Sequence, residues 1–500
     1  MSIKKLAGQT LWYGVPTIVG KFLSYFLNLL LIWIYEPVNI SSITQLYVLV
    51  PFLNIIFTYG LETSFFRFIR EGSFKRVYGT MLTSITVSTL VLSLLMLPVI
   101  PYLTHRFKAD DHPGFFYWML TILVFDTLSA LPFARLRYEE RPRKFALIKM
   151  LNVSIHLGLF VFFIALCPKL YALYPNSPFL FFYNPSYNIS YYVIANILAS
   201  LVTLILLGNE LFSSEYVFDG ALLRRILRYS FPLLIVGFGG MIGELFSRLT
   251  YTLVATGTDE QVRHELGVFS GVYRIVVMVN MFIFAYRMAA EPFFFRQAQS
   301  DNARETYARL MNVFVMVCCT IFLIIVLYLD AWEYIITLKS KSYAEAISII
   351  PILSVGAIFL GIYYNQSVWY KLSDRNKQGA YITVAGAAIT IAMNLLLIPV
   401  FKYNGAAWAT LTSYLFMMVT SYIMGQKYYP IPYDLKKVFR MISVALLLYG
   451  VQYLLSILFS SRIVHLFTAT ILLFTFIGWI IRSEKALFSR FPLLSKFTRE

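Results

Sequence analysis

Long apolar segments follow one another along the whole chain, and they restrict the fold more than any other feature. A bilayer core of about 30 Å takes about 20 apolar residues per helix. Each such segment must be helical, because hydrocarbon offers no partner for an unpaired backbone N–H or C=O. We count fourteen segments, at residues 9–35, 43–66, 77–103, 114–134, 144–167, 189–212, 229–255, 266–293, 306–330, 345–370, 378–401, 404–426, 438–459 and 463–481.

The composition supports the same class. Of the 500 residues, 59% are hydrophobic and only 13% are charged, which is far from the balance of a soluble domain. The first segment is too long for a signal peptide and lacks a small-residue cleavage site, so we interpret it as a membrane span. The sequence therefore predicts an all-α polytopic membrane protein.

Charge predicts how the helices are oriented. With fourteen spans, alternate loops divide the 42 basic residues very unevenly. The positive-inside rule places the basic side, which includes both termini, in the cytoplasm. The same distribution places most of the basic residues beside anionic lipid headgroups. The net charge of +17 therefore does not indicate nucleic-acid binding. The poorer side contains Arg106, Lys108, Lys169, Arg263, Lys339, Lys341, Lys402 and Arg462.

A charged signature occurs twice in the chain. Glu-x-x-Phe-Phe-Arg occupies residues 62–67 and again 291–296. Other features recur in the same order: YGVP at 13–16 and YSFP at 229–232, then Tyr47 with Asn54 and Tyr273 with Asn280. We interpret spans 1–6 and 7–12 as two copies of a six-helix unit. An even number of helices gives both copies the same orientation, as in parallel-repeat transporters.

This repeat predicts the domain organisation. Residues 1–212 form an N-lobe and residues 229–428 a C-lobe. Residues 213–228 form a cytoplasmic linker helix with leucines on one face and arginines on the other, typical of an interfacial helix. Residues 429–500 contribute spans 13 and 14 and a cytoplasmic tail.

Three stretches resemble the bacterial polysaccharide flippases: LAGQTLWYGVPTIVGKFLSYFLN, PFLNIIFTYGLETSFFRF and FAYRMAAEPFFF. These flippases belong to a superfamily with multidrug–cation antiporters and flippases of peptidoglycan precursors. The resemblance implies two lobes around a central cavity that opens alternately to each side. The implied cargo is a polyprenyl-diphosphate-linked oligosaccharide, such as an O-antigen or capsule unit, moved from the cytoplasmic to the periplasmic leaflet of the bacterial inner membrane.

Ionisable side chains within the spans are candidates for function, since each is costly at bilayer depth. A diphosphate needs charged donors in place of its hydration shell, and guanidinium groups bind phosphate oxygens bidentately. Lys21, Arg248, Arg274 and Arg287 lie on spans 1, 7 and 8, which line the cavity in the family, and they are our candidates for binding the headgroup.

Structural ion pairs are the alternative for these cations. Glu244 lies four residues before Arg248, and Arg287 lies four residues before Glu291, so each pair can neutralise itself on one helix face. Lys149, near the cytoplasmic end of its helix, is expected to reach lipid phosphate.

The remaining candidates, for gating or coupling, are Glu62, Asp126, Glu244 and Glu291. Glu62 and Glu291, at the cytoplasmic ends of equivalent helices, are either helix-end residues that pair across to the other lobe or gate residues. Asp126 is a candidate for binding Na⁺ or a proton, or for pairing with Lys149 or with a hydroxyl group. His156 is a weaker candidate for a proton relay.

Other function classes fit less well. The longest predicted outer loop, PKLYALYPNSPFLFFYNPSYN, contains no Asp, Glu or His, so no catalytic residues or enzyme activity are predicted. The three cysteines have no metal-ligand spacing, so no metal or cofactor is expected. A multidrug–cation antiporter is the main competitor, but it favours carboxylates over the cations found here. Expected partners are membrane lipids, the lipid-linked oligosaccharide, and a polysaccharide polymerase or glycosyltransferases.

Overall fold

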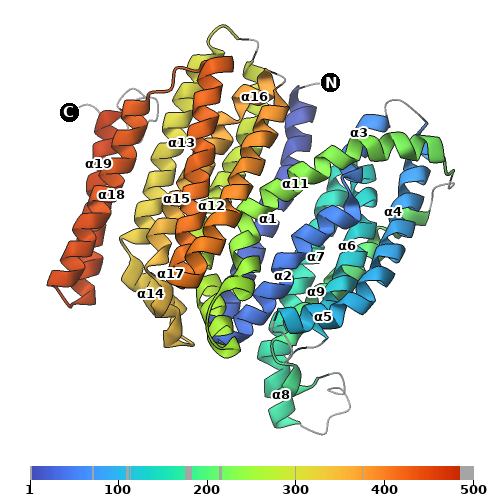
Figure 1. The fold of residues 1–500 in the computed structure, drawn as a ribbon, viewed down its shortest axis with the longest axis horizontal. Coiled ribbons are helices and arrows are strands. Elements are labelled where there is room, and N and C mark those ends of the chain that lie inside the picture. The colour runs from blue at the N-terminus through green and yellow to red at the C-terminus, as the bar shows by residue number, and fades with distance from the viewer. Residues whose placement is uncertain are drawn as a thin grey trace. The chain divides into compact units, whose positions relative to one another are not determined.

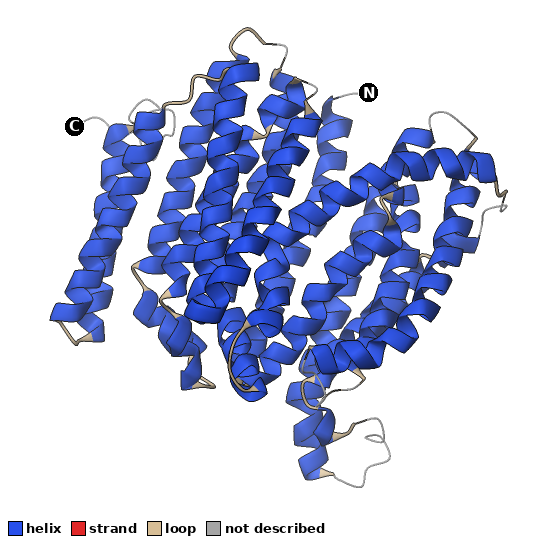
Figure 2. Cartoon of the chain, in the orientation of Figure 1, coloured by secondary structure: helices blue, strands red, loops and turns tan. Residues whose placement is uncertain are grey.

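Every regular element in the described part of the chain is a helix (Figure 2). The computed structural model describes residues 3–69, 73–107, 112, 114–174, 183–212, 217–298, 300–373 and 375–484. Side chains are described from residue 19 onward, and those of several residues between 232 and 296, including Glu244 and Glu291, lie outside the described part. The all-α class predicted from the apolar segments is confirmed.

The chain divides into two compact units at Gly267. Helices of the first unit are α1 (Ile3–Ile34), α2 (Pro37–Thr58), α3 (Leu61–Phe68), α4 (Phe74–Met96), α5 (Ile100–Arg106), α6 (Phe115–Tyr138), α7 (Pro142–Val161), α8 (Cys167–Leu173), α9 (Ser190–Leu206), α10 (Gly208–Phe212) and α11 (Gly220–Val254). In Figure 1, α2, α6, α7 and α9 run side by side, as their contacts require.

The second unit begins within α12 (Asp259–Gln297). Its other helices are α13 (Ala303–Val326), α14 (Leu329–Ile336), α15 (Ile349–Gln366), α16 (Val368–Leu372), α17 (Asn376–Tyr428), α18 (Leu435–Leu458) and α19 (Arg462–Ser483). The last two helices pack on each other and on α13 (Figure 1). The lobe boundaries at 212, 228 and 428 stay predictions.

Ten helical stretches in the described part are long and apolar enough to cross a membrane, which is expected of a multi-pass membrane protein. Two shorter apolar helices, Val19–Ile34 and Ser190–Leu206, coincide with predicted spans. The count of fourteen and the orientation of the termini stay predictions. All three cysteines are buried and unbonded.

The second predicted span is broken in the structure. Tyr59 and Gly60 adopt positive φ angles of 33° and 71°, so α2 ends at Thr58 and α3 starts at Leu61. Glycine adopts this left-handed conformation at little cost in free energy. As a result, the first copy of the signature lies on its own eight-residue helix.

The eleventh and twelfth predicted spans form an antiparallel pair within α17. Lys402, with φ 52° and ψ −132°, reverses the chain between them. Thr390 Oγ1 donates a hydrogen bond of 2.8 Å to Ser413 Oγ across the pair. Gly405 lies so close to the first helix that a Cβ atom would sit 2.3 Å from the carbonyl oxygen of Leu397, so only glycine fits.

The predicted linker helix does not end where we expected. The helix α11 begins at Gly220, with Asp219 as its N-cap, and continues without interruption to Val254. The predicted linker and the seventh predicted span thus share one helix, and the domain boundary at residue 228 stays a prediction. Pro232 lies inside the helix, which membrane-spanning helices tolerate.

Candidate functional site

Both copies of the signature use a buried phenylalanine in the same way. Phe65 packs edge-on against Tyr78 with ring centres 6.0 Å apart, and Phe294 packs edge-on against Tyr307 at 5.2 Å. In each copy the tyrosine follows the phenylalanine by thirteen residues and is fully buried. The repeat read from the sequence is therefore matched by equivalent packing inside each unit.

The charged residues of the signature lie at helix ends. Glu62 is in the first turn of α3 and Arg67 in its last turn, where each has the sign that the helix dipole favours. Glu62 forms an ion pair with Arg137 of α6, within the same unit. This is not the pairing across to the other lobe that we expected for the structural role, and the role of Glu62 as a gate stays a prediction. The side chain of Glu291 lies outside the described residues.

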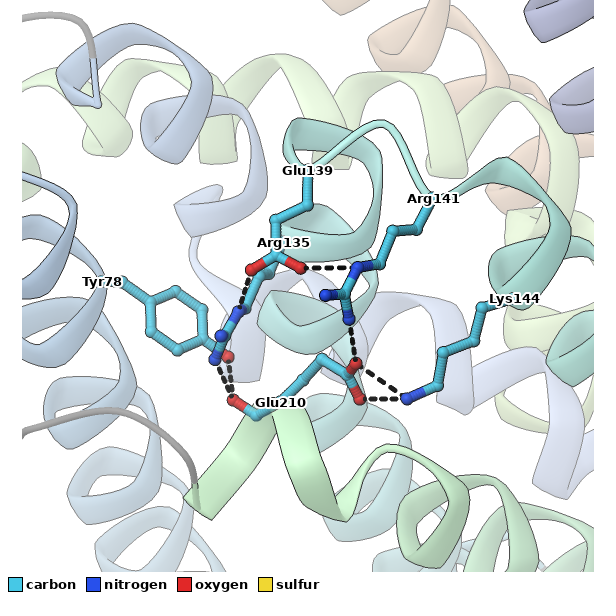
Figure 3. Close-up of polar contacts among 6 residues, drawn as sticks. All are labelled: Tyr78, Arg135, Glu139, Arg141, Lys144 and Glu210. Atoms are coloured by element: carbon cyan, nitrogen blue, oxygen red, sulfur yellow. Dashed lines mark hydrogen bonds and ion pairs between the residues drawn. The ribbon is translucent and has the colours of Figure 1, made fainter.

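A network of charges connects the helices α4, α6, α7 and α10 of the first unit (Figure 3). Its centre is Glu210 on α10, whose side chain is 2% exposed. Lys144 Nζ donates to the two carboxylate oxygens of Glu210 at 2.7 and 2.8 Å, and Arg141 Nη1 lies 3.6 Å away. The backbone oxygen of Glu210 accepts hydrogen bonds from Tyr78 Oη at 2.8 Å and Arg135 Nη1 at 3.0 Å.

Each carboxylate of this network is paired with cations: Glu139 with Arg135 and Arg141, and Glu210 with Arg141 and Lys144. Arg135 Nε also donates to Glu139 at 2.6 Å, so the buried carboxylate is enclosed by paired groups. A buried charge is tolerated only when it is paired and hydrogen-bonded. Sequence analysis missed Glu210, although an acid at the end of the sixth apolar segment, on the same predicted side as the basic loop 135–144, was a usable signal.

The start of α11 is tied to α4. The Asp219 side chain accepts hydrogen bonds from the backbone N–H groups of Ala221 and Leu222, and Arg76 Nε donates to it at 2.6 Å. The backbone bond from Leu222, followed by the bond and charge of Arg76, lowers the pKa of Asp219 below its ordinary value. These contacts favour the ionised form of the carboxyl group.

This lowered pKa predicts how pH affects the start of α11. The stabilisation is complete above the pKa of an unfolded aspartate, about 3.9, and is lost as the pH falls through the lower folded-state value. We expect amide exchange at the start of α11, corrected for the intrinsic rate, to accelerate below that range. In Asp219→Asn the pH-dependent part should vanish. The same acid-induced change in Asp219→Asn as in the natural chain would contradict this assignment.

A row of polar side chains runs through the middle of the first unit. Asp126, at the centre of α6, accepts a hydrogen bond of 2.8 Å from Ser200 Oγ of α9. On the neighbouring α2, Tyr47 Oη accepts a 2.7 Å bond from Asn196 Nδ2 of α9. Asp126 is exposed, although its carboxylate is hydrogen-bonded to α9. An intramembrane acid placed in this way is expected to face a polar, hydrated surface.

Two further candidates lie beside this row. The Lys149 side chain is exposed, and its ammonium group lies 4.2 Å from the centre of the Phe133 ring. Its contact with lipid phosphate stays a prediction. His156 Nε2 lies 3.1 Å from the carbonyl oxygen of Tyr192, so this nitrogen carries the proton and donates. That bond gives the histidine a structural role.

The four predicted headgroup cations fall in both units. In the first unit, Lys21 of α1 is exposed and Arg248 of α11 is half-buried. In the second unit, Arg274 is 8% exposed, and the Arg287 guanidinium lies 4.5 Å from the centre of the Tyr364 ring. The carboxylates expected to pair with Arg248 and Arg287, Glu244 and Glu291, have side chains outside the described part. Headgroup binding by these cations therefore stays a prediction.

Arg287 also lines a small pocket in the second unit together with Lys371, Tyr286, Tyr364 and Ser367. The cavity holds about 10 Å³, which is room for roughly one water molecule. Over the residues described, no group of three or more His, Cys, Asp or Glu side chains is arranged to hold a metal ion.

Comparison with solved structures identifies the fold. The lipid II flippase MurJ, in an inward closed conformation, superposes with a TM-score of 0.74 at 13% identity, covering 94% of this chain and 99% of that chain. A multidrug resistance MATE family transporter of the MOP superfamily, in an inward-facing conformation, gives 0.62 at 12% identity, covering 84% and 96%. An outward-facing conformation of a MATE family transporter gives 0.55 at 13% identity, covering 87% and 96%. The chain has the fold that these membrane transporters share.

The family follows from the sequence model that matches the chain. A model described as "polysaccharide biosynthesis protein" matches residues 6–298. The match covers more than half of the chain, and the chain belongs to this family. A comparison with curated protein sequences finds no match. The resemblance seen in the sequence motifs is thus confirmed at the level of the family and fold.

Proposed function

We propose that the protein is an alternating-access flippase. It moves a polyprenyl-diphosphate-linked oligosaccharide, such as an O-antigen or capsule unit, from the cytoplasmic to the periplasmic leaflet of the inner membrane. One observation carries the proposal: a chain of a polysaccharide biosynthesis family has the fold of membrane transporters. Polysaccharide assembly requires a transporter where a glycan built on one side of a membrane is used on the other.

The charged side chains give this function a chemical basis. We assign the binding of the diphosphate head to Lys21, Arg248, Arg274 and Arg287, because cations replace the water that phosphate oxygens lose. The lipid II flippase MurJ has a similar fold over nearly its whole length. The proposed partners are the lipid-linked glycan, membrane lipids, and the glycosyltransferases or polymerase acting before or after transport.

Depletion of the protein from growing cells tests this function. We expect the lipid-linked glycan to accumulate facing the cytoplasm, where an impermeant glycan-binding probe reaches it only after the cells are opened. Restoring the protein should return the glycan to the outer face. Unchanged glycan lipids would contradict the flippase proposal.

Multidrug–cation antiport is the second candidate, because MATE transporters share the fold. It requires recognition of cationic or neutral drugs, for which carboxylates are suited better than the four cations named above. Under this alternative, depletion leaves the glycan lipids unchanged and makes the cells sensitive to cationic dyes.

Asp126 is our proposed residue for Na⁺ or proton coupling. Its carboxylate accepts one hydrogen bond, from Ser200, and retains other lone pairs for an ion. We expect Asp126→Asn to reduce transport driven by an ion gradient about tenfold or more, because the neutral amide cannot exchange a charge. Transport should be measured in vesicles with and without imposed Na⁺ and proton gradients. The control is Ser200→Ala, which keeps the carboxylate, and a gradient response of Asp126→Asn equal to that of the natural chain would exclude this role.

A further inference from the structure

Four arginines line one pocket at the start of α11 in the first unit. The cavity has a volume of about 360 Å³, within the usual range for small-ligand sites. Phe68 and Tyr229 form its apolar walls. The described residues that line it are cationic or aromatic, and all four arginines are exposed: Arg67 on α3, and Arg224, Arg225 and Arg228 on α11.

The helices around this pocket are fastened together. Ser64 Oγ of α3 and Ser230 Oγ of α11 share a hydrogen bond of 2.6 Å. Thr80 Oγ1 of α4 donates to the carbonyl oxygen of Val217 at 3.1 Å, just before α11, and the Arg76–Asp219 ion pair holds the first turn. These contacts hold in place the helices that carry the arginines of the pocket.

The aromatic walls orient the cations. The Arg67 guanidinium lies 4.2 Å from the centre of the Tyr229 ring, and that of Arg225 lies 5.7 Å from the centre of the Phe68 ring. Cation–π contacts of this kind restrict the arginine side chains without neutralising their charge. The cations remain able to attract an anion.

Successive side chains of a helix are rotated by about 100° around its axis. The side chains at the start of α11 therefore fall into three sectors. Ile226 and Ser230 are buried against the core of the first unit. Leu227 and Phe231 lie on an adjacent sector and are 41% and 65% exposed. Arg224, Arg225 and Arg228 lie on the third sector. A basic sector beside an exposed apolar sector is typical of a helix at a membrane surface.

These features narrow the chemistry of the ligand. Four like charges around one cavity repel one another, and a bound polyanion would relieve this repulsion. Planar guanidinium groups match phosphate oxygens bidentately, and a diphosphate offers more charge and more acceptors than one phosphate. The apolar sector beside the pocket suits a ligand that carries a hydrocarbon chain, which favours a lipid headgroup over a free anion.

We propose that this pocket, which we name the arginine pocket, receives the diphosphate head of a polyprenyl lipid at the edge of the membrane. It is separate from Lys21, Arg248, Arg274 and Arg287, none of which lines it. The identity of the lipid rests on the proposed function. The pocket adds a first docking position, where the head binds before translocation begins.

Binding of farnesyl diphosphate to the purified full-length protein in phosphatidylcholine nanodiscs tests the proposal. We expect the double variant Arg224→Gln and Arg228→Gln to bind about tenfold more weakly than the natural chain. Both side chains are exposed, so the variant should fold and melt normally. The matched control removes two exposed cations of the second unit, Arg309→Gln and Lys377→Gln, and should bind as the natural chain does.

Competing ligands identify the source of the phosphate. Farnesyl monophosphate and inorganic pyrophosphate should compete weakly, because the first lacks a phosphate and the second lacks the chain. Pyrophosphate competing as well as farnesyl diphosphate would overturn the lipid assignment and leave a site for soluble anions. Displacement by phosphatidylglycerol in the nanodiscs would overturn the preference for a diphosphate.

Two results would overturn the site itself. One is equal weakening in the matched control, which means non-specific charge attraction. The other is binding that is lost in Lys21→Ala with Arg248→Ala but kept in Arg224→Gln with Arg228→Gln. Since this measurement needs no transport, its failure leaves the depletion result on glycan export standing. If depletion instead favours drug export, the lipid is no longer the proposed cargo. The measured binding of farnesyl diphosphate to the arginine pocket would still stand.

Discussion

Replacing Arg274 with alanine is expected to reduce glycan export about tenfold to a hundredfold while the protein still inserts into the membrane. A hydrogen bond to a charged group contributes about 1.5–3 kcal/mol, and the lost guanidinium removes at least one such bond to the diphosphate. Arg274→Lys should retain part of the activity, because lysine keeps the charge but not the planar fork. The measurement is the fraction of lipid-linked glycan that reaches the outer leaflet in cells carrying each variant.

The melting temperature of the same variants separates binding from packing. Arg274 is 8% exposed, so a purely structural role would lower the melting temperature of the alanine variant. We expect export to fall much more than stability. Lys21→Ala and Arg248→Ala should change export in the same direction, and the exposed Arg309→Ala should leave it unchanged. Normal export by Arg274→Ala would contradict the assignment of this cation.

The second large effect concerns the buried carboxylate of Glu210. We expect Glu210→Gln to destabilise the protein by about 3 kcal/mol, which lowers the melting temperature of a chain of this length by roughly 3 °C. The amide leaves Lys144 without its counter-charge, whereas Arg141 keeps Glu139 at 3.2 Å. Lys144 is one-third exposed, so water recovers part of the loss. The hydrogen bonds to the backbone oxygen from Tyr78 and Arg135 should persist. Thermal unfolding in detergent measures the effect.

A compensating variant makes this test specific. Adding Lys144→Gln to Glu210→Gln removes both charges of the closest pair and should recover part of the lost stability. The exposed acid Glu305, changed to glutamine, serves as the control and should melt as the natural chain does. Equal melting of Glu210→Gln and the natural chain would show that the network contributes little.

The fold was predictable because membrane-spanning helices appear in the sequence as uninterrupted apolar stretches. The reversal at Lys402 falls between two such stretches, so its position could be anticipated. The break at Tyr59 and Gly60 was missed because it lies inside one of them. The continuation of α11 beyond residue 228 was missed because the linker and the following span differ in composition. In the structure, both belong to one continuous helix.

The candidate site was less predictable because its groups come from distant segments. The double signature identified Phe65 and Phe294, and the packing of each on its tyrosine follows from the repeat. The Glu210 network and the arginine pocket join residues that lie far apart in the sequence, so composition and spacing do not show them. Such contacts become visible only when the helices are packed.

Reconstitution tests the central claim most directly. The purified protein is placed in liposomes that contain the lipid-linked oligosaccharide extracted from depleted cells, and a lectin added outside measures how much glycan crosses the bilayer. We predict that crossing depends on the natural protein and falls sharply with Arg274→Ala. Crossing at the rate of protein-free liposomes, under both Na⁺ and proton gradients, would contradict the flippase account.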